Sequence, residues 1–195
     1  MKLVFASNNA HKLAEVRQIM PSGVEILSLH EIGFEHEIDE TGTTLEQNSA
    51  IKAEAVYNWI LDNGQWAIDG VFADDTGLEI DALDGKPGVY TARWAGEPAA
   101  NRAKALHELE GKTNRGAQFR TVITFINANG DRFAVSGIVR GRIAEEEYGQ
   151  GGFGYDPVFI PEGYDKTFGE LPAAVKNRIS HRSRALAELV KALNR

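Results

Sequence analysis

Phe72-Ala73-Asp74-Asp75-Thr76-Gly77-Leu78 joins an apolar strand to two adjacent carboxylates and a hydroxyl. Carboxylates at the open end of a strand usually meet a cation or a reacting water. Consecutive strand side chains point to opposite faces, so Asp74 and Asp75 serve one ligand only if the chain turns between them. Thr76-Gly77 is typical of a turn, and we expect it to bend the chain between two short strands, 71–74 and 78–83. A motif this short is also typical of a solvated turn, so its meaning depends on the other polar clusters.

Length and composition predict one globular domain over residues 1–195, within which two closely fused lobes are an alternative. Hydrophobic residues make up 43% of the chain and charged residues 25%, without low-complexity tracts. The absence of cysteine excludes disulfides, thiol catalysis and thiolate metal sites. A net charge of −7 argues against binding to nucleic acid or an anionic membrane. An anionic substrate must therefore meet a local cluster of bases, together with a divalent cation.

Neither a signal peptide nor a membrane span is indicated. Residues 1–6 resemble a short strand, and no apolar run has the length that a signal peptide or a membrane helix requires. The five histidines show no close helical pairing of the zinc-hydrolase kind. The sequence therefore favours a cytoplasmic protein without a zinc site.

The order of elements predicts a mixed α/β fold. Strands are expected at 2–6 and 24–29, and a helix at 12–20. Thr43 and Glu46 form a capping box at the start of a second helix, which Gly64 ends. A third helix is expected at 97–109 and a last one at 179–193.

The clearest hairpin joins 119–128 to 132–140 through Asn129-Gly130, which is typical of a type I′ turn. Its first strand is apolar at successive positions, which predicts burial on both faces. Together these elements predict an elongated, mixed, twisted sheet flanked by helices.

The segment 7–12 lies between the first strand and the first helix, where exposed N–H groups and the positive helix end would receive a phosphate. A plain N-cap supplied by Asn8 or Asn9 is the alternative. Lys12 favours the phosphate, because a cation in the first turn opposes the helix dipole unless an anion is bound.

Asn48 and Lys52 lie four residues apart on the second predicted helix and therefore project from one face. They can address the same ligand, although a solvated helix face is the alternative. Glu40 precedes this helix and is either part of the same site or an acid that the helix dipole favours.

Two later segments resemble a site for a nucleobase. The segment 151–157 combines glycines, which permit close backbone approach, with Phe153, Tyr155 and Asp156, although a glycine-rich turn anchored by core aromatics is the alternative. The segment 176–182 places cationic donors at the start of the last predicted helix, where an anion or acceptor-rich ligand, or plain solvent, would meet them.

Taken together, these segments resemble the inosine triphosphate pyrophosphatase family, the Ham1/RdgB-like nucleoside-triphosphate pyrophosphatases. The resemblance runs through seven segments in the family order, at 7–15, 40–44, 48–53, 73–78, 87–93, 152–157 and 179–182. Two departures are visible: Thr76 replaces the usual serine, and Gly169 stands where the family commonly has alanine. A hydroxyl is retained at the first, and the second concerns packing more than chemistry.

The resemblance implies a cytoplasmic, homodimeric, magnesium-dependent enzyme. It would cleave the small molecules ITP, dITP and XTP at the α–β phosphoanhydride, giving the monophosphate and pyrophosphate, before these purines enter DNA or RNA. The fold would have two lobes with a nucleotide cleft between them. Mg²⁺ fits this expectation, since it prefers oxygen ligands and is often held by one or two carboxylates with substrate phosphates.

The family motifs assign roles by position. Asp75, Lys12 and Lys52 would be catalytic, and Glu40 and Asp75 would be metal-associated. Whether Asp75 ligates metal or activates water stays open. The substrate would be bound by Ser7, Asn8, Asn9, Ala10, His11, Lys12, Asn48, Thr76, Phe153, Gly154, Tyr155, Asp156, Lys176, His181 and Arg182.

Selectivity would follow from the acceptor at position 6 of the purine, where ATP carries a donor. Donors from Lys176, His181 or Arg182 would favour the 6-oxo base, so the hypothesis is that Arg182→Ala lowers the preference for ITP over ATP.

Two other classes of protein are alternatives to this enzyme. A nucleotide-binding regulator would bind without turnover, and a general phosphatase would release orthophosphate.

Overall fold

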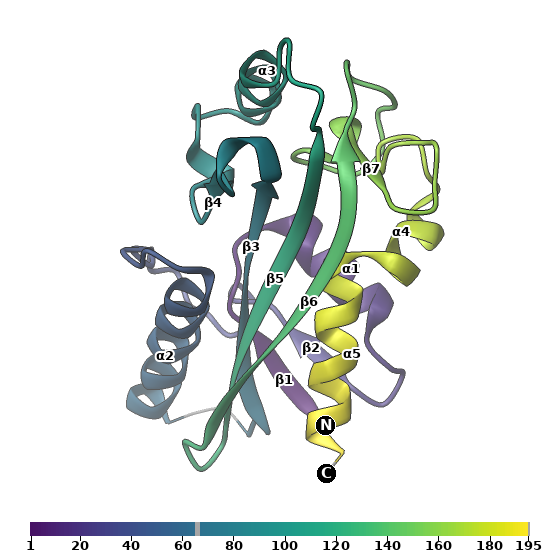
Figure 1. The fold of residues 1–195 in the computed structure, drawn as a ribbon. Helices are drawn as coiled ribbons and strands as arrows, with labels where there is room; N and C mark the ends of the chain where they lie inside the picture. The colour runs from purple at the N-terminus through teal and green to yellow at the C-terminus, as the bar shows by residue number, and fades with distance from the viewer. Residues whose placement is uncertain (65–66, 195) are drawn as a thin grey trace. The chain divides into compact units, whose positions relative to one another are not determined.

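A computed structural model describes residues 1–64 and 67–194 of this mixed α/β protein. The sheet has the strand order β2-β1-β3-β5-β6-β7, with β4 paired to β3. Its strands are β1 (Lys2–Phe5), β2 (Glu25–Leu27), β3 (Gly70–Ile80), β4 (Pro87–Gly88), β5 (Gly116–Asn127), β6 (Arg132–Ile143) and β7 (Phe159–Pro161). The helices are α1 (Ala10–Ile19), α2 (Leu45–Asn63), α3 (Pro98–Glu108), α4 (Ala173–Ile179) and α5 (His181–Leu193). The predicted mixed sheet flanked by helices is confirmed (Figure 1).

The chain forms two compact units, and β3, β5 and β6 contribute residues to both. The first unit consists of Met1–Asp75, Thr121–Gly137 and Arg182–Arg195, and the second of Thr76–Arg120 and Ile138–His181. The expected nucleotide cleft and the single domain stay predictions.

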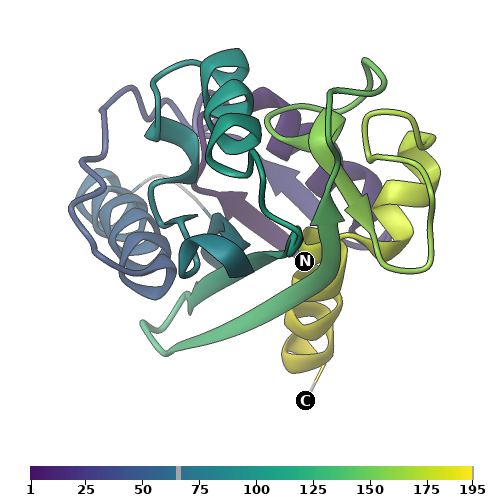
Figure 2. The same ribbon diagram turned by 45° about the horizontal axis from the view of Figure 1, so that its top comes forward.

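Helices cover both faces of the sheet in the first unit. β1 pairs in parallel with β2 and β3. Leu3 and Phe5 pack with residues of α1 and α5, such as Val16, whereas Val4 packs on the other face with residues of α2, such as Val56. Figures 1 and 2 show α5 on one side of these strands and α2 on the other. This alternation decides where the carboxylates of β3 point.

β3 is one continuous strand, Gly70–Ile80, so the predicted turn at Thr76-Gly77 is wrong. Strand pairing continues beyond Thr76-Gly77, because β4 pairs with β3 at Leu78 and Glu79. Cross-strand pairing has overridden the local turn preference of a threonine–glycine pair. Asp74 and Asp75 therefore project to opposite faces of the sheet.

The predicted helix ends are largely confirmed. Asn9 is the N-cap of α1, and Gly64 ends α2 in the left-handed conformation at φ 59°. The N-cap of α2 is Thr44 rather than Thr43, and its hydroxyl accepts from the N–H of Gln47 rather than from Glu46. The capping signal was therefore displaced by one residue.

The hairpin between β5 and β6 is confirmed, but its type I′ turn is wrong. That turn requires positive φ at Asn129 and Gly130, and only Gly130 has it, at 89°. The N–H of Gly130 instead donates to the carbonyl of Asn127 at 3.0 Å. The Asn127 side chain accepts from the N–H groups of Asn129 and Asp131, both at 2.9 Å, and so stabilises a longer loop.

The last predicted helix, 179–193, is confirmed, but it begins at His181 because a separate short helix ends at Ile179. α4 ends at Ile179 and α5 begins at His181, with Ser180 extended between them. The Ser180 N–H donates to the carbonyl of Lys176 at 2.9 Å, which closes α4. The unit boundary falls just after this break, since His181 belongs to the second unit and Arg182, the next residue of α5, to the first.

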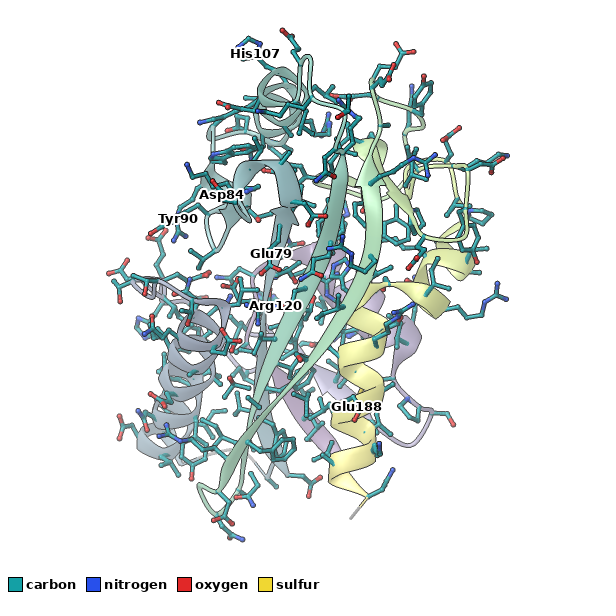
Figure 3. The ribbon with its side chains drawn as sticks, in the orientation of Figure 1. Glu79, Asp84, Tyr90, His107, Arg120 and Glu188 are labelled. Atoms are coloured by element: carbon teal, nitrogen blue, oxygen red, sulfur yellow. The ribbon has the colours of Figure 1, made fainter. Side chains whose placement is uncertain are left out.

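The second unit has its own apolar core, which includes Leu78, Phe119, Tyr155 and Phe159. Outside it, Arg120 Nε on β5 donates to Glu79 Oε1 on β3 at 3.2 Å (Figure 3). In the described part of the chain, no helix has the length and apolar character needed to cross a membrane.

Gly70→Ala is expected to lower the free energy of unfolding by about 1–3 kcal/mol. An added Cβ would stand 2.6 Å from the Phe125 ring and 2.7 Å from the carbonyl of Ile126. Urea denaturation measures the change. Gly23→Ala is the matched control, because its Cβ would meet nothing within 4 Å; equal losses in the two variants would contradict the close packing at Gly70.

Candidate active site

Asp74 is held by two cations on the face of β3 that α1 and α5 cover. Its side chain is 1% exposed. Oδ1 accepts from Lys12 Nζ at 2.9 Å, and Oδ2 accepts from Arg182 Nε at 3.0 Å. Burial raises the pKa of Asp74, but Lys12 and Arg182 outweigh it and hold the pKa well below its usual range. Asp74 therefore stays ionised.

Arg182 extends this arrangement into a row of alternating charges. It pairs with Glu15 on α1 as well as with Asp74, and it is 1% exposed. Burial lowers the pKa of Lys12 and Asp74 opposes this change. The row Lys12, Asp74, Arg182 and Glu15 carries no net formal charge, and it holds the Lys12 side chain, which is 15% exposed.

Asp75 lies on the opposite face of β3, where it meets α2. Its Oδ1 is 3.7 Å from Lys52 Nζ, and the same Nζ is 3.3 Å from Glu40 Oε2. Asn48, one turn before Lys52, is fully buried, and Lys52 is 8% exposed. The alternative of a solvated helix face is therefore wrong, and Glu40, Lys52 and Asp75 form one cluster.

The charge of Asp75 is less well compensated than that of Asp74. Burial is the main cause that raises its pKa, and the carboxylates of Glu40 and Asp74 add to the effect. Lys52 and Lys12 oppose it without reversing it. Two adjacent aspartates thus have pKa values shifted in opposite directions, which is the pattern that separates a structural acid from a proton acceptor.

The donors at Asp75 fit a hard divalent cation. Glu40 and Asp75 bring two carboxylates to one ammonium group, within 4 Å of Lys52 Nζ. Among residues 1–64 and 67–194, no group of three or more histidines or acids could hold a metal alone. This set matches the sites of Mg²⁺, which are often completed by substrate phosphates and water.

The segment before α1 is an open helix N-terminus. Asn9 Oδ1 accepts from the N–H of Lys12 at 3.1 Å, and Ser7 Oγ accepts from the N–H of Asn9 at 3.2 Å. Asn8, Ala10 and His11 are exposed. The first turn of α1 contains no acid. The cap is thus confirmed, and the phosphate expected at the same place stays a prediction.

The second unit contains the aromatic cluster. Asp156 Oδ2 accepts from Lys176 Nζ at 2.6 Å and from the N–H of Phe153 at 2.8 Å. Lys176 Nζ lies 4.7 Å from the centre of the Phe153 ring. A Cβ at Gly152 would clash with the Asp156 carboxylate, so this position requires glycine. A buried lysine–aspartate pair thus supports one aromatic ring.

Two other expected residues have structural partners in this unit. Tyr155 donates its hydroxyl to the carbonyl of Thr91 at 2.7 Å, and burial raises its pKa. The His181 ring stacks on Phe119 with centroids 4.6 Å apart. Thr76 is the first residue of the second unit and is half-buried in β3.

Arg182 differs most from the expectation. It was grouped with Lys176 and His181 as a donor to the base, whereas its ion pairs are with Asp74 and Glu15 of the first unit. Glu15 was not among the expected site residues. Its spacing of three residues from Lys12, on the same helix face, was the available signal.

Lysines beside carboxylates that could hold Mg²⁺ form a donor set that suits the phosphates of a substrate. The chain belongs to the Ham1 family, whose sequence profile matches residues 3–192. It is 48% identical to the dITP/XTP pyrophosphatase of Flavobacterium johnsoniae over 99% of this chain and 98% of the relative. It is 49% identical to the dITP/XTP pyrophosphatase of Porphyromonas gingivalis, over 96% and 95%. The Ham1 protein of Staphylococcus aureus superposes with a TM-score of 0.85 at 38% identity, covering 100% of this chain and 98% of that structure.

Asp75→Asn and Asp74→Asn are expected to change stability in opposite directions when both are measured at pH 7 with EDTA. The raised pKa of Asp75 means that its charge destabilises the fold above the pKa of the unfolded chain, so Asp75→Asn should raise Tm. The lowered pKa of Asp74 means that its charge stabilises the fold there, so Asp74→Asn should lower Tm.

The pH dependence supplies the control. The stabilising effect of Asp74 is lost as pH falls through its folded-state pKa, so the deficit of Asp74→Asn should shrink in acid. The gain of Asp75→Asn should also vanish at a pH where both states are protonated. Thermal scans across this range would contradict the assignment if both variants lost Tm at neutral pH.

Proposed function

We propose that the protein hydrolyses the non-standard purine nucleoside triphosphates ITP, dITP and XTP to the monophosphate and pyrophosphate. This reaction would keep deaminated purines out of DNA and RNA. The observation that carries the proposal is the cluster of Glu40, Lys52 and Asp75 beside the row that begins at Lys12. The similarity to proteins named dITP/XTP pyrophosphatase, over nearly the full length, supports it.

The triphosphate is bound by the cations of the first unit. Lys12 and Lys52 act as point charges, each held by carboxylates, so that their positions are set before the substrate binds. The exposed N–H groups at the start of α1 add donors for a phosphate oxygen. Ser7, Asn8 and His11 line this segment.

Asp75 acts as the proton acceptor. A water oxygen attacks the α-phosphorus, its proton passes to Asp75, and the bond from the α-phosphorus to the bridging oxygen breaks with departure of pyrophosphate. The pKa of Asp75 is raised in the metal-free protein and a bound cation would lower it, so the role rests on the place of Asp75 beside Lys52 and Glu40. Asp74 is unsuited to this role, because Lys12 and Arg182 engage both of its oxygens.

Glu40 and Asp75 would hold the Mg²⁺ ion. When bound, this ion neutralises phosphate charge that would otherwise repel the attacking oxygen. In this proposal the pairing of both acids with Lys52 keeps them close to one another before the ion arrives.

The purine base is recognised in the second unit. Phe153 provides a face for stacking, and Gly154, at φ 61°, sets the backbone beside it. Lys176 and His181 supply donors that suit a 6-oxo purine and oppose the 6-amino group of ATP. Lys176 also donates to Asp156 Oδ2, so this acceptor does not serve the amino group of adenine.

A cytoplasmic homodimer is also proposed. Its support is the family to which the chain belongs.

The central test is turnover of ITP, XTP, GTP and ATP with Mg²⁺, resolving pyrophosphate from orthophosphate. Pyrophosphate from ITP and XTP is expected, with loss of about 100-fold or more in Asp75→Asn, the scale of general-base catalysis. Orthophosphate would favour a general phosphatase. Nucleotide binding without any product would favour a regulator. Either result would overturn the proposed reaction.

Lys176→Met is expected to lower the preference for ITP over ATP by about 5-fold or more, the scale of one hydrogen-bonded base contact. The ratio of the two kcat/KM values does not depend on the fraction of enzyme that is folded. Lys104→Met is the matched control, because Lys104 lies over the Trp94 ring in the same unit. An unchanged ratio in Lys176→Met would remove Lys176 from base selection.

A further inference from the structure

The side chain of Asn48 joins helix α2 to the loop that carries Glu40. Asn48 is fully buried, and its Oδ1 accepts from the N–H of Gly42 at 2.8 Å. Glu40 stands two residues before Gly42 in the sequence, and Lys52 follows Asn48 by one helical turn. A single turn of α2 thus anchors the loop and provides the ammonium group that Glu40 meets.

Gly42 fits this contact closely. A Cβ at this position would stand 2.5 Å from Asn48 Oδ1 and 2.7 Å from Gln47 Cβ. Any larger residue must therefore move the loop or the amide. The contact needs glycine on one side and a short side chain with an acceptor on the other.

Stability alone does not explain a buried asparagine here. Among the described residues, Asn48 Nδ2 has no hydrogen-bond partner, and a buried donor without an acceptor destabilises the folded state. The loop also has a second attachment, because the N–H of Thr43 donates to Gln47 Oε1 at 2.7 Å. The Asn48 contact is the one nearer in sequence to Glu40.

We propose that Asn48 and Gly42 are positioning residues that fix Glu40 beside Lys52 and Asp75, and thereby set the affinity for the divalent cation. The inference rests on the proposed function, within which it gives Asn48 a role other than substrate contact. Asn48 acts through the loop backbone, and the substrate is not required for its effect.

The first readout is hydrogen exchange of the Gly42 amide by NMR. Asn48→Ala should accelerate this exchange by about 2- to 10-fold, the range expected for loss of one hydrogen bond. Asn48→Asp retains an acceptor and should keep the exchange slow. The Gly64 amide, which donates to Ile60 at the far end of α2, is the internal control for overall destabilisation.

The second readout is affinity for Mn²⁺ alone, followed by electron paramagnetic resonance, together with the Mg²⁺ concentration that half-activates ITP hydrolysis. Asn48→Ala and Gly42→Ala should each weaken both by about 3-fold or more, and the double variant should add little, because the two changes remove one contact. At saturating Mg²⁺ the KM for ITP should stay near that of the unaltered protein. Asn63→Ala is the matched control, since its amide donates to Trp59 at the other end of α2.

Gly42→Ala decides the question if Asn48→Ala does not fold. Unchanged metal dependence in a folded Gly42→Ala, or additive losses in the double variant, would overturn the positioning role. If the unaltered protein does not hydrolyse ITP, the proposed function fails, and the positioning role is then judged from Mn²⁺ affinity alone. Weakened Mn²⁺ binding in both variants supports the positioning role. Unchanged Mn²⁺ binding overturns it.

Discussion

The buried guanidinium of Arg182 constrains the first unit more than any other group. Among the described residues, Arg182 has the largest fully buried side chain. A charge that is buried in this way must be neutralised within the protein. Asp74 and Glu15 supply this neutralisation from β3 and α1, so one cation ties α5 to both elements. Removal of any partner would leave a buried charge without compensation. The position of Lys12 depends on this arrangement, because Asp74 binds both cations.

Asp75 shows the opposite balance. Its neighbours compensate its charge only in part, and the protein accepts that loss of stability at one strand position. Asp74 and Asp75 show how two neighbouring residues of one strand can have different roles. Alternation of side chains gives one aspartate to the packed face of α1 and α5, and the other to the cluster with Lys52.

Local signals were sufficient for much of the fold. Gly64 and Asn9 marked helix ends, and the spacing of Asn48 and Lys52 placed both on one face of α2. The continuous strand β3 could not be read from Thr76-Gly77, because the strands that pair with it are remote in sequence.

The candidate site was likewise predictable from the sequence only in part. The lysines, the acids and the aromatic cluster were all visible as sequence motifs, yet the partners of Arg182 were not. Asp74 and Glu15 lie far from Arg182 along the chain, at separations of 108 and 167 residues. Charge pairing over such separations has no local pattern. Only the alternation of side chains along a strand indicates that Asp74 and Asp75 differ, and the turn preference of Thr76-Gly77 obscures this signal.

Gly70 acquires a further meaning from this arrangement. The strand cannot slide by one residue without bringing a side chain against the Phe125 ring and the carbonyl of Ile126, where only glycine fits. Such a slip would also exchange the two aspartates between the faces of the sheet. The glycine at the start of β3 therefore acts as a register stop, and the distance along the strand from it to Asp75 determines which carboxylate faces Lys52.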